Sequence, residues 1–160
     1  MRQVEAFEEI DAPPDVVWKV LLEFDSYPEW NPLGRSIEGV SLEDEQFSVR
    51  LAPPEPHGVA FRPEVLVAEE NRRLAWRCRL LVPFAFDAYH EFRLEPIDEG
   101  ERSSSKPGSR GGGRTRLLQR ETFRGALVPT LLDEECVERG FRRMNAAVRE
   151  RAERRVGILA

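Results

Sequence analysis

Hydrophobic residues recur at helical spacing in the last quarter of the chain, and this pattern predicts one long amphipathic helix from Pro129 to Val156. With 100° between successive residues, one face collects the small and apolar residues Gly140, Phe141, Met144, Ala147, Val148 and Ala152. Charged residues, among them Arg142, Arg143 and Glu153, fall off this face. We therefore expect a helix with one side against a core and the other in water.

A shorter helical pattern lies near the start of the chain. Val4–Ile10 has the composition of a first strand, and the Asp-Ala-Pro-Pro segment after it stops the strand and favours a helix start. Apolar residues then recur at i, i+3, i+4 and i+7 from Val17 to Phe24, which predicts a short helix. The segment from Tyr27 to Pro32 is bounded by prolines and predicts a compact turn or a second short helix.

Between these helical patterns the hydrophobic period is two, which predicts strands. The expected strands are Gly34–Val40, Gln46–Ala52, Val59–Glu69, Arg73–Leu81, Phe84–Pro96 and Arg114–Arg124. The polar, glycine-rich segment Asp98–Gly113 is interpreted as a flexible hairpin tip, because the strands on both sides need each other as partners. With the first strand, the pattern gives six or seven candidate strands.

The alternation also assigns the two faces of each strand, since successive side chains point to opposite sides of a sheet. The inward residues of the last three strands are Leu74, Trp76, Cys78 and Leu80, then Phe86, Ala88, His90, Phe92 and Leu94, then Leu117, Gln119, Glu121 and Phe123. The outward residues are mostly arginine on two strands and carboxylate on the strand between them, a charge pattern that neighbouring antiparallel strands favour.

Three polar residues thereby face the interior: His90, Gln119 and Glu121. A buried carboxylate without partners is costly and tends to take up a proton. One interpretation is a satisfied structural network, in which Glu121 bonds to His90 or to a backbone amide. The other is a cavity that holds water or a ligand, whose orientation a few polar groups fix. The sequence leaves both open.

Composition and charge narrow the class of protein. A chain of 160 residues with 41% hydrophobic content is long enough for one domain, residues 1–160, with a real core. A formal net charge of -5 gives no electrostatic case for nucleic-acid binding. The chain has no apolar run long enough to insert stably in a membrane and no secretory signal pattern, so a cytoplasmic protein is expected. The oligomeric state is open, and a homodimer is compatible with the sequence.

The sequence contains no recognisable metal or cofactor motif. The two histidines, His57 and His90, have no second nitrogen or sulfur ligand at a metal-binding spacing, and no cofactor fingerprint or nucleophile motif is present. Cys78 and Cys136 lie far apart in a chain without a secretory signal, which disfavours a disulfide. We therefore expect no metal and no cofactor.

Several segments in this order resemble a known superfamily: IDAPPDVVW, YPEWNP, LAW, HEFRLE, QRETFRG and FRRMNAAV. From about Phe7 to Ala152 the chain is similar to the START-like, polyketide cyclase/dehydrase-type superfamily, also called SRPBCC or Bet v 1-like. The resemblance implies an α+β helix-grip fold, in which a seven-stranded antiparallel sheet curves around the long C-terminal helix. Two short helices after the first strand would close one end, with a mainly apolar cavity between sheet and helix.

The first functional hypothesis is therefore the binding of a small hydrophobic molecule, such as a lipid, an isoprenoid or a polyketide-like compound. The candidate ligand-binding residues are Trp76, Phe86, His90, Phe92, Gln119, Glu121, Phe123, Phe141 and Met144. For most of them taken singly, an ordinary core position is the alternative. A second hypothesis is a cyclase- or dehydratase-like enzyme in which His90 and Glu121 share acid/base work. A third is a partner-binding or chaperone-cofactor module that uses the arginine-rich face of the last helix. The resemblance supplies no catalytic residues.

Overall fold

The computed structural model describes residues 1–30, 35–41, 46–51, 60–61, 64–79, 84–97 and 113–157. The helical elements are α1 (Pro14–Leu22), the 3-10 helix η1 (Phe24–Ser26), α2 (Tyr27–Trp30), α3 (Val128–Leu131) and α4 (Glu134–Arg155). The strands are β1 (Arg2–Ile10), β2 (Arg35–Ser41), β3 (Gln46–Leu51), β4 (Ala60–Phe61), β5 (Glu64–Glu69), β6 (Arg73–Arg79), β7 (Asp87–Ile97) and β8 (Arg114–Arg124).

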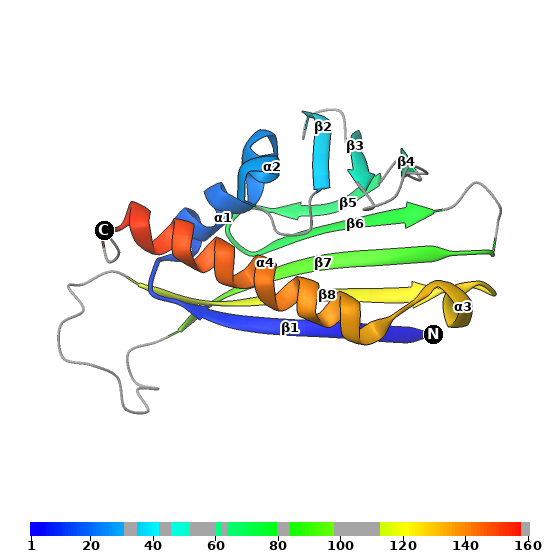
Figure 1. The fold of residues 1–160 in the computed structure, drawn as a ribbon. Coiled ribbons are helices and arrows are strands. Elements are labelled where there is room, and N and C mark those ends of the chain that lie inside the picture. Colours follow the sequence, from blue (N-terminus) through cyan, green and yellow to red (C-terminus); the bar gives the residue numbers. More distant parts are fainter. Residues whose placement is uncertain are drawn as a thin grey trace.

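The strands form one antiparallel sheet, and α4 lies across one of its faces (Figure 1). The strand order is β1-β8-β7-β6-β5-β3-β2, and β4 pairs with β3 outside this path. The α+β architecture with an antiparallel sheet and a C-terminal helix is thus confirmed. The expected count of seven strands differs from the eight in the described part of the chain, because the predicted strand Val59–Glu69 is divided into β4 and β5.

The predicted single helix from Pro129 to Val156 is wrong in its first part. The structure has two helices there, α3 and α4, separated by Leu132 and Asp133, whose backbones are extended. The Oδ1 atom of Asp133 accepts a hydrogen bond from the backbone N–H of Cys136 at 2.9 Å, as an N-cap residue does. The apolar pattern continues through α3 and α4, so periodicity alone does not reveal the break.

The apolar stripe of α4 packs inward as expected, with two polar additions. Gly140, Phe141, Met144, Val148 and Ala152 are buried, and Ala147 is half-buried. Asn145 and Glu153 are buried as well. For Glu153 this corrects the outward assignment: its Oε1 accepts a hydrogen bond from the backbone N–H of Asp11 at 3.1 Å, which joins α4 to the end of β1. A backbone donor on the facing segment therefore outweighs the polar preference of this side chain for water.

The core extends between the sheet, α1 and α4. In α1 the buried residues Val17, Trp18, Val20 and Leu21 form its apolar face, and a proline in the first turn suits the helix start. Among the strands, α4 approaches β1 most closely, and it also packs against α1. No helix in the described part of the chain is long and apolar enough to cross a membrane.

The opposite face of the sheet carries a network of ion pairs between neighbouring strands. Glu5 pairs with Arg120, Glu64 with Arg77, and Asp87 with Arg79. The alternation predicts the outward positions of Arg77, Asp87 and Arg120, but it does not predict that Glu91, on the same face, is almost fully buried. Desolvation alone would raise the pKa of the Glu91 carboxyl, but hydrogen bonds from Arg93 and Arg73 and their charges lower this pKa below its usual range.

Candidate functional site

The three inward polar residues meet on the sheet face that α4 covers. The register of β7 and β8 places His90 directly opposite Glu121 and Phe92 directly opposite Gln119. The His90 Nδ1 atom lies 3.4 Å from Glu121 Oε2. The Gln119 Nε2 atom lies 3.3 Å from His90 Nε2 and 3.5 Å from the sulfur of Met144 on α4. Gln119, His90 and Glu121 therefore form one connected group, which we call the polar cluster.

Aromatic rings enclose the imidazole of His90. The ring of Trp76 on β6 stacks on it, with centroids 4.5 Å apart and an interplanar angle of 9°. Phe92 and Phe141 meet it edge-on, at centroid distances of 4.8 and 5.5 Å. Phe141 comes from α4, so the rings join the helix to the sheet across the polar cluster. This arrangement holds the imidazole in one plane.

Burial decreases along the polar cluster. The exposed fraction is 0% for Gln119 and 1% for His90, whereas 12% of the Glu121 side chain is exposed. Among the described residues, Gln119 Oε1 and His90 Nδ1 are buried atoms without a hydrogen-bond partner. Such atoms are uncommon in folded proteins, and each costs roughly 1–3 kcal/mol. The cluster therefore has hydrogen-bonding capacity that the described protein groups leave unused.

Asn145 is a buried polar residue of this region that the sequence did not single out. Its Nδ2 atom donates to the carbonyl of Ala6 on β1 at 3.3 Å, and its Oδ1 atom has no hydrogen-bond partner in the described part of the chain. Ala6 is the register partner of Gln119, so Asn145 belongs to the same strip of the helix–sheet contact. The available signal was a single amide directly after Met144 in an otherwise apolar stripe.

The remaining predicted residues lie in a second, adjoining apolar cluster. Phe123 is buried, and its ring packs against the half-buried Phe86 at a centroid distance of 5.9 Å. Phe141 belongs to this second cluster and also contacts His90, so it connects the two. The nine candidate residues thus fall into two adjoining groups, one around His90 and one around Phe123, and Phe141 links them.

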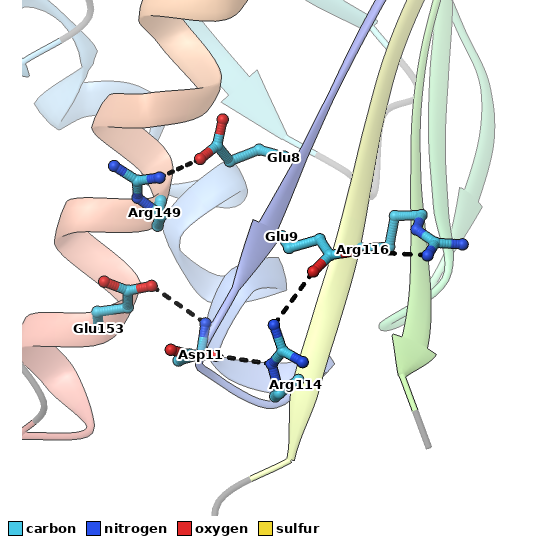
Figure 2. Close-up of polar contacts among 7 residues, drawn as sticks. All are labelled: Glu8, Glu9, Asp11, Arg114, Arg116, Arg149 and Glu153. Carbon is cyan, nitrogen blue, oxygen red and sulfur yellow. Dashed lines mark hydrogen bonds and ion pairs between the residues drawn. The ribbon is translucent and has the colours of Figure 1, made fainter. Parts of the chain in front are cut away.

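A cleft of about 680 Å³ lies elsewhere, beside the ends of β1 and α4. Its described lining residues are Glu9, Asp11, Trp30, Arg114, Arg143, Ala146, Ala147, Arg149, Glu150 and Glu153. Figure 2 shows that Arg114 bridges Glu9 and Asp11, that Arg149 pairs with Glu8, and that Glu153 reaches the backbone of Asp11. Most of these charges are engaged within the protein. None of the nine candidate residues lines this cleft.

Three arginines on the surface of α4 are paired within the helix. Arg139 pairs with Glu135, Arg142 with Glu138, and Arg154 with Glu150, each at i, i+4. Exposed pairs of this kind are typical of a solvated helix surface. Among the described residues, no group of three or more His, Cys, Asp or Glu residues is arranged to hold a metal ion.

Comparison with known proteins identifies the family. The family model described as "Polyketide cyclase / dehydrase and lipid transport" matches residues 1–157. No curated protein sequence matches the chain.

Solved structures show the same fold. The Zhui aromatase/cyclase from Streptomyces sp. R1128 is similar with a TM-score of 0.67 and 23% identity, over 97% of this chain and 95% of that one. The protein DR_A0006 from Deinococcus radiodurans is similar with a TM-score of 0.63 and 23% identity, over 98% and 99% of the two chains. The di-domain ARO/CYC BexL of the BE-7585A biosynthetic pathway is 16% identical, with a TM-score of 0.66, over 96% of this chain and 47% of that one. The chain belongs to the polyketide cyclase/dehydrase and lipid transport family.

Proposed function

We propose that the protein binds a small, mainly apolar molecule between the sheet and α4, with the polar cluster fixing the orientation of the ligand. The observation that carries the proposal is a pair of buried amide oxygens, Gln119 Oε1 and Asn145 Oδ1, that have no hydrogen-bond partner in the described part of the chain. Ligand sites are mostly apolar and contain a few well-placed polar groups of this kind. A ligand that supplies the missing hydrogen bonds would recover part of their cost.

The shape of the surroundings favours a ligand with a flat ring system over a plain acyl chain. Trp76 stacks on His90, and Phe92 and Phe141 present ring edges to it, so planar groups surround the polar cluster on several sides. A similar structure carries the name aromatase/cyclase, which agrees with a polyketide-like ligand. Lipids and isoprenoids are the other members of the expected class.

Entry of a ligand requires side chains to move. Phe141 and Met144 both contact the polar cluster from α4 and are buried. Methionine is unbranched and adapts to irregular space, so rotation of Met144 is the least costly way to make room. Binding then replaces contacts of these two side chains by contacts with the ligand.

Native mass spectrometry of the purified protein, with a thermal-shift screen of lipids and aromatic polyketide-like compounds, tests the proposal. We expect a co-purifying compound or a concentration-dependent rise in melting temperature. Phe141→Ala should change the preferred ligand size, whereas Phe84→Ala, at an exposed ring, should not. Absence of both a co-purifying compound and a thermal shift across the panel would contradict the proposal.

A second candidate function is acid/base catalysis, because the separation of 3.4 Å between His90 Nδ1 and Glu121 Oε2 suits proton transfer within the pair. The test is incubation of a bound polyketide-like compound followed by mass analysis. Conversion that is lost in Glu121→Gln while binding persists would support an enzyme. Recovery of the compound unchanged would support binding without catalysis.

A further inference from the structure

The amide of Gln119 lies against the far side of the His90 ring from Glu121. Its Nε2 atom lies within hydrogen-bond distance of two acceptors, His90 Nε2 at 3.3 Å and the sulfur of Met144 at 3.5 Å. An amide NH2 group has two hydrogens, so both contacts can be made at once. Gln119 thus acts on His90 from a fully buried position.

This contact determines where the proton of a neutral imidazole resides. A neutral imidazole has one N–H group and one acceptor nitrogen, and the partner of one nitrogen selects the role of the other. Because the amide of Gln119 donates to Nε2, Nε2 is the acceptor and Nδ1 carries the hydrogen. The Nδ1 atom lies 3.4 Å from Glu121 Oε2 without a well-aligned hydrogen bond, so the negative charge of the carboxylate favours a hydrogen on Nδ1.

The opposite amide orientation is disfavoured by both neighbours. It would turn the carbonyl oxygen of Gln119 toward the sulfur of Met144, placing two acceptors together. It would also move the ring hydrogen to Nε2 and leave the lone pair of Nδ1 facing the carboxylate of Glu121. Two acceptors in contact inside a protein lose a hydrogen bond and repel each other.

We infer that Gln119 is a positioning residue that holds His90 as the Nδ1–H tautomer, so that Glu121 presents its carboxylate to the ligand as a hydrogen-bond acceptor. The ligand group that Glu121 takes is then a donor, such as a hydroxyl, and not a carboxylate. This last step rests on the proposed function. Burial decreases from Gln119 through His90 to Glu121. Glu121 is therefore the member of the polar cluster that a ligand can reach, since only its side chain has appreciable exposure.

Nitrogen-15 NMR of labelled histidine tests the role of Gln119 without any ligand. The chain has only two histidines, and a His57→Gln variant assigns their signals. At about pH 8.5, where an ordinary histidine is neutral, we expect a protonated Nδ1 and an unprotonated Nε2 for His90. An Nε2–H tautomer in the unmodified protein would overturn the inference.

Two substitutions show whether residue 119 controls this state. Gln119→Glu places an acceptor at Nε2 if the new carboxyl is ionised, which its infrared band shows; Nε2 should then become protonated, and an unprotonated Nε2 beside the ionised carboxylate contradicts the inference. If that variant does not fold or its buried carboxyl stays protonated, Gln119→Met retains the approximate size and removes the donor. The Nε2 signal should then move from its hydrogen-bonded position, and an unchanged signal overturns the role of Gln119.

Three matched probes test the ligand step: 1-naphthol, 1-methoxynaphthalene and 1-naphthoate. Naphthol should bind about tenfold more tightly than the other two, the difference typical of a hydrogen bond to a charged group. Glu121→Gln should reduce this preference severalfold. Equal binding of naphthol and either analogue contradicts the donor requirement while the proposed function stands. Binding of none of the three, together with no co-purifying compound and no thermal shift across the lipid and aromatic panel, contradicts the proposed function, and the nitrogen spectra still decide the role of Gln119.

Discussion

The Nε atom of Arg73 on β6 donates to Oε1 of Glu91 on β7 at 2.5 Å, on the face of the sheet that α4 does not cover. Only 3% of the Glu91 side chain is exposed. Arg93 donates to the same oxygen at 3.0 Å, and Arg120 on β8 lies 4.0 Å from the other oxygen. One carboxylate therefore joins β6, β7 and β8 from the outside.

Glu91→Gln should destabilise the protein by about 2 kcal/mol, because two charge-assisted hydrogen bonds lose their ionised acceptor. Chemical denaturation in urea measures the change. Glu95→Gln is the matched control, since Glu95 is exposed on the same strand and the same face. The control should stay within about 0.5 kcal/mol of the unmodified protein. Similar losses of stability in both variants would show that the contacts of Glu91 with the arginines contribute no more than an exposed glutamate does.

The lowered pKa of Glu91 also predicts that the folded protein loses stability in acid. The arginines hold its pKa in the folded protein below the value of about 4.3 that is usual for an unfolded chain. Its stabilising contribution is therefore present above the unfolded pKa and is lost as the pH falls through the folded pKa. The stability difference between the unmodified protein and Glu91→Gln should shrink below about pH 4. A difference that is constant from pH 7 to pH 3 would rule out this linkage.

The buried hydroxyl of Tyr27 predicts that the protein also loses stability at alkaline pH. Its hydroxyl donates to the carbonyl of Leu21 at 2.5 Å, and burial raises the pKa of Tyr27 far above its usual range. The folded pKa is higher than the unfolded value of about 10, so this stabilisation is present below the unfolded pKa and is lost above it. In Tyr89→Phe, Tyr27 is the only tyrosine. Its phenolate absorbance should appear only together with loss of far-ultraviolet dichroism; phenolate in a folded protein would contradict this.

Gly125, in the turn after β8, should not tolerate a side chain. Its φ is +130°, and a Cβ atom there would lie 2.3 Å from the carbonyl oxygen of Ala85. Gly125→Ala should therefore cost more than about 2 kcal/mol, from backbone strain and a clash with main-chain atoms. Gly157 is the control, because its φ is +74° and nothing lies within 4 Å of the added atom. Gly157→Ala should cost about 1 kcal/mol, and equal melting temperatures of the two variants would refute the clash.

Substitution of Asp133 tests whether the chain forms two separate helices, α3 and α4, as the structure shows. Asp133→Ala removes the cap on the N–H of Cys136 and should cost about 1 kcal/mol. In a continuous helix the same change would be neutral or stabilising, because alanine has the higher helix propensity. Glu135→Ala, an exposed neighbour in the first turn of α4, controls for the loss of a negative charge. Thermal unfolding of both variants distinguishes the two cases.

The faces of the strands could be predicted from sequence, but their register could not. A period of two puts His90, Gln119 and Glu121 on one side of the sheet. Whether His90 meets Glu121 depends on how β7 aligns with β8, and the long polar connection between these strands does not specify an alignment. The meeting of the three residues is thus compatible with the sequence and determined only by the fold.

Burial of polar residues was the main feature that sequence reasoning missed. Alternation places Glu91 on the outer face, but the arginines that cover it come from its own strand and two neighbouring strands. Glu153 is buried because the backbone of Asp11, distant in sequence, offers a donor. Asn145 is buried because the carbonyl of Ala6 accepts from it. In each case the partner is supplied by tertiary structure, which single-residue preferences do not encode.

The path of α4 has a consequence for the capacity of the interior. The helix approaches β1 most closely among the strands, and Phe141 and Met144 extend from it to His90 and Gln119. At the polar cluster, these two buried side chains fill the space between helix and sheet. Exchange of either for a smaller residue therefore leaves a cavity at this place, at a cost in stability. Residues 141 and 144 are thus the positions at which substitution changes the free volume beside His90 and Gln119.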